Sequence, residues 1–452
     1  MNKKITKIAM CSSVSGLLFG YDAGIISGVL IFITEEMGMN ATEIGLVVAS
    51  VPLGALFSSA ISGYISDHAG RKKSLLLTAA LFTLGSMLCG LAQEMYFFII
   101  GRCVLGFAIG IGSCVSPVYT AEISGKESRG WLVNLYVCSI QTGIFLSFFI
   151  GYLLSKSENW RLMIMLGIIP SVIFFVLILS SPESPRWLLT KNRVESARKI
   201  LASFYEKATA ENMIKNVLSM VKKDKQSTIS IIIKQPKFLK VLFIGVSVSF
   251  FTQTVGINAF NYYGPTIFIE TGFTTVTQAM LYSMLFGFTL VISTISSLFF
   301  IDKVGRRKPL LSGTSMIAII LAVITIGFAI IDDPKILALL FLGSAIFFML
   351  LHGTSIGPAC FLIPSEIFPN QVRGIFMGIS VAINWLANTI ISILTPLIIN
   401  SHGISSLFLI FFILTVIGFI IFYFFVPETK NVELETIEKN IINGSKCLYL
   451  GK

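Results

Sequence analysis

Two residues of opposite charge stand inside apolar stretches of this 452-residue chain, where ionisable side chains are rare. Asp22 lies within an apolar run near residues 9–33, and Arg102 lies within another near residues 96–120. A charge in a hydrocarbon environment is costly, so such residues usually pair with an opposite charge and mark a functional site. We expect Asp22 and Arg102 to form a buried ion pair.

Proton exchange is the chemistry that this pair could support. The positive charge of Arg102 favours the ionised carboxylate of Asp22, whereas the apolar surroundings favour the neutral acid. Moving the two partners apart would let the carboxylate take up a proton. The structural alternative is a fixed ion pair that only holds two helices together.

The other reactive residue types form no recognisable catalytic or metal-binding set. The three histidines allow no HExxH zinc motif, and the seven cysteines show no paired ligand spacing. The glycines between residues 106 and 112 stand in an apolar run with no strand before them, so they fit close helix packing better than a dinucleotide loop. We expect no cofactor and no metal, and transport fits the sequence better than catalysis.

The composition places these residues in a membrane protein. Hydrophobic residues make up 54% of the chain and charged residues 13%, whereas soluble proteins carry about 25% charged residues. The apolar content matches about twelve spans of about twenty residues, the length that crosses a bilayer core. Because an α-helix satisfies its own backbone hydrogen bonds in lipid, each apolar run predicts a helix. The runs lie near 9–33, 44–65, 74–92, 96–120, 131–154, 162–180, 238–269, 277–301, 309–331, 336–364, 374–399 and 404–426.

The basic residues orient these helices. With both termini on one side of the bilayer, that side carries 30 Lys and Arg residues and the other side carries three. The positive-inside rule then predicts that both termini are cytoplasmic. Topology thus explains the net charge of +11, and nucleic-acid binding is not expected.

Charged loop signatures of the first half recur in the second half, at offsets of 235 to 245 residues. Asp67, Gly70 and Arg71 recur as Asp302, Gly305 and Arg306; Glu122 and Arg129 recur as Glu366 and Arg373; and Pro182-Glu183 recurs as Pro427-Glu428. The repetition predicts an all-α integral membrane protein with twelve transmembrane helices in two six-helix bundles, residues 1–180 and 238–426. A cytoplasmic linker with short helices, 181–237, joins the bundles, and residues 427–452 form a cytoplasmic tail. Such repeats are typical of secondary transporters that bind substrate near the midplane.

Ordered motifs along nearly the whole chain carry a family resemblance. They are GLLFGYDAGIISG (16–28), DHAGRKK (67–73), RCVLGFAIGIGSCVSPVYTAEI (102–123), PESPRWLL (182–189), QTVGINAFNYYGP (253–265), DKVGRRK (302–308), PSEIFPNQVRG (364–374), NWLAN (384–388) and PETK (427–430). The set resembles the sugar porter family of the major facilitator superfamily. The resemblance implies the major facilitator fold and transport of a sugar.

The resemblance also implies roles for individual residues. Asp22 and Arg102 match the proton-coupling pair of bacterial sugar symporters. Amide side chains both donate and accept hydrogen bonds without desolvating a charge, which suits sugar hydroxyls, although such amides could instead only link helices. The implied substrate-binding residues are Gln141, Gln253, Asn258, Tyr262 and Asn384, with Trp385, Phe361 and Asn388 as further pocket positions.

Helical geometry limits how these amides can meet. Gln253 and Asn258 lie about 140° apart on an ideal helix of 3.6 residues per turn. Both can face one ligand only if the helix is irregular here, and Gly256, Gly264 and Pro265 allow such an irregularity.

Three positions depart from the family pattern. Thr252 replaces the first of two consecutive glutamines, Phe361 replaces the tryptophan of GPxxW, and Leu290 replaces an asparagine. Since these changes remove hydrogen-bonding groups, the sequence predicts a sugar or polyol substrate without naming one.

Charged residues at the cytoplasmic ends of both halves are predicted to form a gate. Their ion pairs would close the outward-facing state and separate when the halves rock inward; a solvated basic rim is the alternative. The predicted gate residues are Asp67, Arg71, Glu122, Arg129, Glu183, Asp302, Arg306, Glu366, Arg373 and Glu428.

These observations predict a proton-coupled importer of a monosaccharide, either hexose, pentose or polyol, in a bacterial inner membrane. Its partners would be the sugar or polyol, the proton and the lipid bilayer, and a monomer is compatible with the sequence. A facilitative uniporter is the first alternative. A transporter-like sugar sensor and a membrane-embedded transferase are less favoured, because few residues follow Val426 and no catalytic constellation is visible.

Overall fold

The computed structural model describes residues 3–124, 129–223, 237–272, 275–369, 372–430, 432, 434–445 and 447–450, and some side chains within helices lie outside this description. The first half contains α1 (Lys3–Met37), α2 (Ala41–Ala69), α3 (Arg71–Gly90), α4 (Met95–Ile123), α5 (Arg129–Leu154), α6 (Trp160–Met165) and α7 (Ile168–Leu179). The second contains α12 (Phe238–Thr254), α13 (Ile257–Glu270), α14 (Val276–Val304), α15 (Arg307–Ile330), α16 (Pro334–Leu351), the π-helix η1 (His352–Ile356), α17 (Gly357–Ile367) and α18 (Arg373–Phe425).

The helix α18 accounts for two membrane spans. Eleven helical spans in the described part of the chain are long and apolar enough to cross a bilayer, and α18 is counted among them once. Its 53 residues would extend about 80 Å at 1.5 Å per residue, far more than a bilayer core of about 30 Å. Gly403, with φ of 79°, breaks the helix and turns the chain back. The prediction of twelve transmembrane helices is therefore confirmed.

A second break divides the span at residues 238–270. Gly256 adopts the left-handed conformation, with φ of 96°, between α12 and α13. Only glycine enters this conformation readily, and a Cβ at this position would also approach the ring of Phe411 closely, at 2.7 Å. The predicted irregularity around Gly256 is thus confirmed.

Small residues let the helices of the first half approach one another closely. A Cβ at Gly106 of α4 would collide with the Val51 carbonyl of α2, and one at Gly20 of α1 would collide with the Ile140 carbonyl of α5. Packing of this kind is common where lipid leaves no hydrophobic driving force between helices. The prediction that the glycines of 106–112 pack helices is confirmed.

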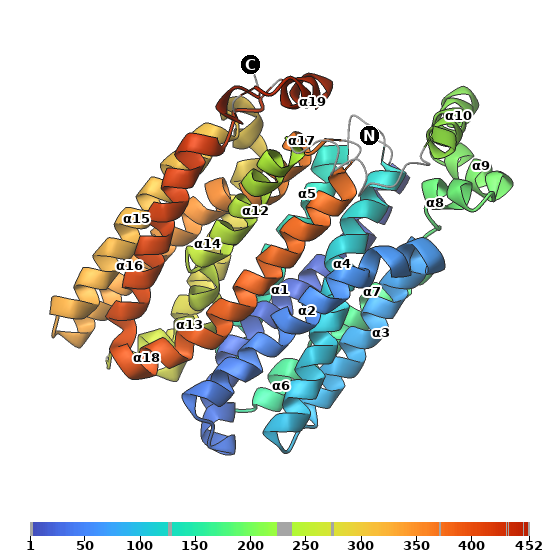
Figure 1. Ribbon diagram of the computed structural model, residues 1–452. Coiled ribbons are helices and arrows are strands. Elements are labelled where there is room, and N and C mark those ends of the chain that lie inside the picture. Colours follow the sequence, from blue (N-terminus) through green and yellow to red (C-terminus); the bar gives the residue numbers. More distant parts are fainter. Residues whose placement is uncertain are drawn as a thin grey trace.

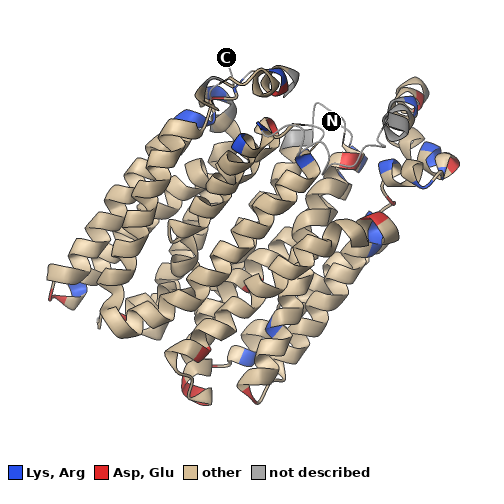
Figure 2. Ribbon diagram, viewed as in Figure 1, with Lys and Arg blue, Asp and Glu red and all other residues tan. Residues whose placement is uncertain are grey.

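Both termini lie at the same end of the molecule, which we call the termini end (Figure 1). The short helices α8 (Pro185–Thr190), α9 (Val194–Ala202) and α10 (Lys207–Lys223) lie there, as does α19 (Leu434–Ile442). Lysine and arginine gather at this end (Figure 2). Short helices in the linker were expected and are found over residues 185–223, whereas residues 224–236 lie outside the described part.

The two halves meet along α2 and α18 and along α5 and α14. Midway along α1, the ring of Phe19 lies 5.3 Å from that of Trp385 in α18. Towards the end opposite the termini, the hydroxyls of Ser155 and Thr277 lie 3.1 Å apart. The halves are thus in contact both midway along α1 and near the end opposite the termini.

Candidate functional site

The predicted ion pair forms in the middle of the first half. Nη1 of Arg102 in α4 donates to Oδ1 of Asp22 in α1 at 2.6 Å. Both residues are only 3% exposed. Nε of Arg102 is also buried and has no hydrogen-bond partner among the described residues. The site therefore holds two charges away from water, joined by one short contact.

Close packing fixes the helix that carries Asp22. The hydroxyl of Tyr21 donates to the Met163 carbonyl of α6. A Cβ at Gly24 would collide with the Ser147 side chain of α5. Because α1 is held on both sides of Asp22, the carboxylate stays in reach of Arg102 in this conformation.

Three predicted amides form one hydrogen-bonded cluster in the second half. Nε2 of Gln253 donates to Oδ1 of Asn384 at 2.9 Å, and Nδ2 of Asn258 donates to Oε1 of Gln253. The break at Gly256 brings Gln253 and Asn258 together although an ideal helix would point them apart. We refer to Gln253, Asn258 and Asn384 as the amide cluster.

A second pair of predicted residues lies beside this cluster. Nδ2 of Asn388 donates to the hydroxyl of Tyr262 at 3.2 Å, and the hydroxyl of Ser392 donates to Oδ1 of Asn388 at 3.2 Å. In this conformation the polar groups partly satisfy one another. A sugar would have to exchange these internal hydrogen bonds for its own.

The first half contributes Gln141 of α5. Its Oε1 is buried and has no hydrogen-bond partner in the described part of the chain, so it could accept a hydrogen bond from a ligand. Trp385 is 5% exposed and packs on Phe19 of the first half. Phe361 differs, because its side chain is 49% exposed, and its assignment to the pocket stays a prediction.

Sequence reasoning missed three residues that lie near the amide cluster: Ser249, Cys360 and His352. Nδ2 of Asn384 also lies 3.1 Å from the Ser249 carbonyl and 3.6 Å from Sγ of Cys360. His352 begins the π-helix that precedes α17. A π-helix depends on backbone geometry and has no clear sequence signal, although a histidine inside an apolar run was visible.

At the termini end, Arg71 of α3 is the centre of an ion-pair network. Its guanidinium donates two hydrogen bonds to Glu122, both at 3.0 Å, and one to Asp67 at 2.8 Å. The carboxylate of Glu183 accepts the backbone N–H groups of Arg71 at 3.0 Å and of Lys72 at 3.2 Å. Glu183 thus caps the N-terminus of α3, where an anion is favourable.

The second half repeats this arrangement. Nη2 of Arg306, the residue directly before α15, lies 2.9 Å from Oε1 of Glu366. Glu428 accepts the backbone N–H groups of Arg306 at 2.9 Å and Arg307 at 3.2 Å. The repeated sequence signatures therefore form the same three-dimensional motif twice.

These contacts bear on the predicted gate. The described ion pairs of Arg71 and Arg306 join elements of the same half, and Nε of Arg373 donates to the Phe368 carbonyl at 3.1 Å. The side chains of Arg129 and Asp302 lie outside the described residues. In this conformation the charges brace each half at its termini end.

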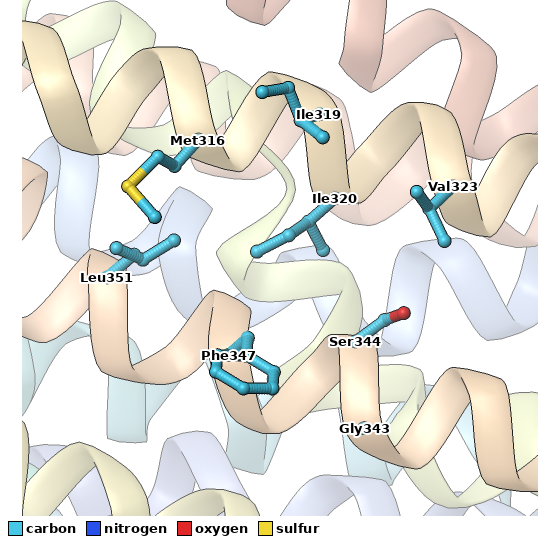
Figure 3. Close-up of a pocket in the computed structure, with 8 residues that line it drawn as sticks. All are labelled: Met316, Ile319, Ile320, Val323, Gly343, Ser344, Phe347 and Leu351. Carbon is cyan, nitrogen blue, oxygen red and sulfur yellow. The ribbon is translucent and has the colours of Figure 1, made fainter.

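An apolar groove of about 390 Å³ lies between α15 and α16 (Figure 3). Its lining includes Met316, Ile320 and Phe347, and Ser344 is its one hydroxyl-bearing residue. Such a lining offers too few hydrogen-bonding groups for a sugar, so the groove is separate from the candidate site.

Comparisons with known proteins agree with this arrangement. The family model described as "Sugar (and other) transporter" matches residues 8–441. An arabinose-proton symporter of Bacillus subtilis is 34% identical, covering 96% of this chain and 94% of the relative. The glucose transporter GlcP of Staphylococcus epidermidis is 33% identical, covering 95% and 96%.

The fold also matches a solved structure. The xylose transporter XylE from E. coli, in a partially occluded inward-open conformation, superposes with a TM-score of 0.83 at 28% identity, covering 95% of this chain and 99% of that one. The chain therefore belongs to the sugar porter family of the major facilitator superfamily, and it is a multi-pass membrane transporter rather than an enzyme.

Proposed function

We propose that the protein imports a monosaccharide or polyol together with protons by alternating access. The observation that carries this proposal is the buried contact between Asp22 and Arg102. A carboxylate that is 3% exposed is stable as an anion only while its partner stays close, so separation of the pair favours protonation. Relatives named as arabinose-proton symporters support coupling of this kind.

The moving bodies in this scheme are residues 1–180 and 238–426, joined by the linker 181–237 and followed by the tail 427–452. The excess of Lys and Arg at the termini end supports a cytoplasmic position for that end, in a bacterial inner membrane. The contact between Ser155 and Thr277 joins the halves near the end opposite the termini, which supports an inward-facing state of the structure.

The amide cluster supports a sugar site on the second half, where Trp385 would form one side of the pocket. Gln141 would contribute from the first half. Sugar hydroxyls would replace the hydrogen bonds that Gln253 now exchanges with Asn258 and Asn384. Tyr262, Asn388 and Phe361 complete the proposed set.

The charged networks at the termini end act as the cytoplasmic gate in this scheme. Within each half they hold the helix ends together, so that the half can rotate as a unit. When the halves rock towards the outward-facing state, the basic and acidic side chains of the two networks approach one another and close the inner end.

An uncoupled uniporter is the second candidate. The tight packing around Asp22 favours a uniporter, because it is also what a fixed, purely structural ion pair would require.

Replacing Asp22 with Asn separates the two candidates. In proteoliposomes we expect Asp22→Asn to retain sugar counterflow, which needs no proton movement, and to lose sugar-driven proton uptake. Asp332→Asn, an exposed acid at the opposite end, is the matched control and should retain both. Unchanged proton uptake in Asp22→Asn would refute the coupling role. The substrates to compare are pentoses, hexoses and inositol, with and without an imposed pH gradient.

A further inference from the structure

One buried histidine beside the amide cluster has no part in the transport scheme above. His352 is 6% exposed and is the first residue of η1, between α16 and α17. Both ring nitrogens are buried, and neither has a hydrogen-bond partner among the described residues. A polar group buried in this way is destabilising unless something satisfies it. Packing alone would be served better by an apolar side chain.

The imidazole lies against the elements that carry the sugar-binding candidates. Its ring lies nearly parallel to that of Phe348, at 13° with 6.1 Å between centroids. A Cβ on Gly357 of α17 would lie 3.3 Å from Cε1 of the ring. The ring also lies close to the main chain of Thr252, the residue before Gln253.

The same turn of α17 leads directly to the amide cluster. Cys360 follows Gly357 by three residues, about one helical turn. Its Sγ lies 3.6 Å from Nδ2 of Asn384. His352 and the amide cluster therefore border the same α12 and α17 segments.

The backbone at His352 is itself unusual. The N–H of Gly357 bonds to the His352 carbonyl, five residues back, in place of the regular four-residue pattern. Insertions of this kind in α-helices frequently coincide with functional sites. Here the π-turn sets the direction of the side chain whose two nitrogens lack a hydrogen-bond partner among the described residues.

We propose that His352 is a substrate-contacting residue that helps to determine which sugar or polyol is bound. In its neutral form the imidazole has one donor and one acceptor, a combination that suits adjacent hydroxyls of a polyhydroxy ligand. Closure of the halves around the ligand would bring those hydroxyls to the ring. This inference rests on the proposed function.

The test uses the full-length protein in lipid nanodiscs and measures sugar affinity by isothermal titration calorimetry. The probes are D-glucose, D-xylose, L-arabinose and myo-inositol, followed by the monodeoxy derivatives of the probe that binds most tightly. The variants are His352→Phe, which removes both hydrogen-bonding atoms, and His352→Gln, which repositions them. Thr415→Val is the control, because this buried hydroxyl bonds within its own helix to the Phe411 carbonyl.

We expect His352→Phe to weaken binding of the best probe about 3- to 10-fold, the effect of one lost hydrogen bond, and Thr415→Val to leave it unchanged. One monodeoxy derivative should bind the wild type more weakly than the parent sugar does, and should bind His352→Phe as well as the parent does. A purely structural histidine would weaken all ligands alike.

The proposal is overturned if each monodeoxy sugar loses the same affinity relative to its parent in the wild type and in His352→Phe. It is also overturned if His352→Phe binds the best probe as tightly as the wild type does. If His352→Phe does not fold, His352→Gln provides the comparison. The loss of affinity that the wild type shows for one monodeoxy sugar, relative to its parent, should then change by about 3-fold or more in His352→Gln. An unchanged penalty overturns the proposal there too. If the wild type binds no probe, the proposed function fails; if it binds normally while His352 has no effect, only this inference fails.

Discussion

A double-mutant cycle on Asp22 and Arg102 measures how strongly the buried pair holds the first half together. The side chains of Asp22 and Arg102 are 4% and 3% exposed and share a 2.6 Å contact. Removing one partner therefore leaves the other charge buried without a counter-charge. Removal of one member of such a pair typically costs about 3–5 kcal/mol, whereas apolar replacement of both is often neutral or stabilising. We therefore expect Asp22→Leu and Arg102→Met each to lose about 3–5 kcal/mol, and the double variant to regain wild-type stability or exceed it.

Stability would be followed by reversible unfolding in mixed micelles with increasing SDS, using helical circular dichroism. Additive losses in the double variant would refute the reasoning, because they would show no coupling between the two residues. Transport separates the structural role from the proton role. A double variant that regains stability but lacks sugar-driven proton uptake supports proton coupling, whereas one that regains both identifies the pair as structural only.

Two further variants test the network at the termini end and the amide cluster. Gly70 has φ of 96° and faces Glu183, so Gly70→Ala should destabilise the protein by more than about 1 kcal/mol, whereas Gly63→Ala, where a Cβ meets open space, should be neutral or slightly stabilising in thermal unfolding. Gln253→Ala removes the centre of the amide cluster and should weaken sugar binding about tenfold or more in calorimetry, since it deletes at least two potential hydrogen bonds. Gln278→Ala, at the exposed start of α14, is its control, and equal affinity of the two variants would contradict the pocket assignment.

The two halves have the same glycine–glutamate arrangement at the termini end. Gly70 and Gly305 both have a positive φ, at 96° and 101°, and each lies against a glutamate carboxylate. In both halves that glutamate accepts the backbone N–H of the first residue of the following helix, Arg71 or Arg307. The glycine is required because a side chain would occupy the carboxylate position. Two similar loops 235 residues apart thus have a common physical reason.

The sequence predicted which amide residues belong to the candidate site but not how they bond to one another. Gln253 and Asn258 could be named, and the need for an irregular helix could be stated, because glycine and proline mark such breaks locally. The sequence does not show that Gln253 bonds to both Asn258 and Asn384, since the last of these is 131 residues away. The sequence also does not show that the nitrogens of His352 lack hydrogen-bond partners among the described residues, because such partners can come from any neighbouring helix.

Local chemistry alone determined that the chain is a membrane protein of twelve helices, which end carries the positive charge, and which few charges lie within the apolar spans. These properties follow from the length and polarity of contiguous segments, because each segment's preference for lipid or water depends on its own residues. Only the tertiary structure decided that Asp22 meets Arg102, that the described charges of the termini end pair within each half, and that three amides share one cluster. Such pairings depend on the relative rotation and depth of helices distant in sequence, and those are set by the packing of all the spans together.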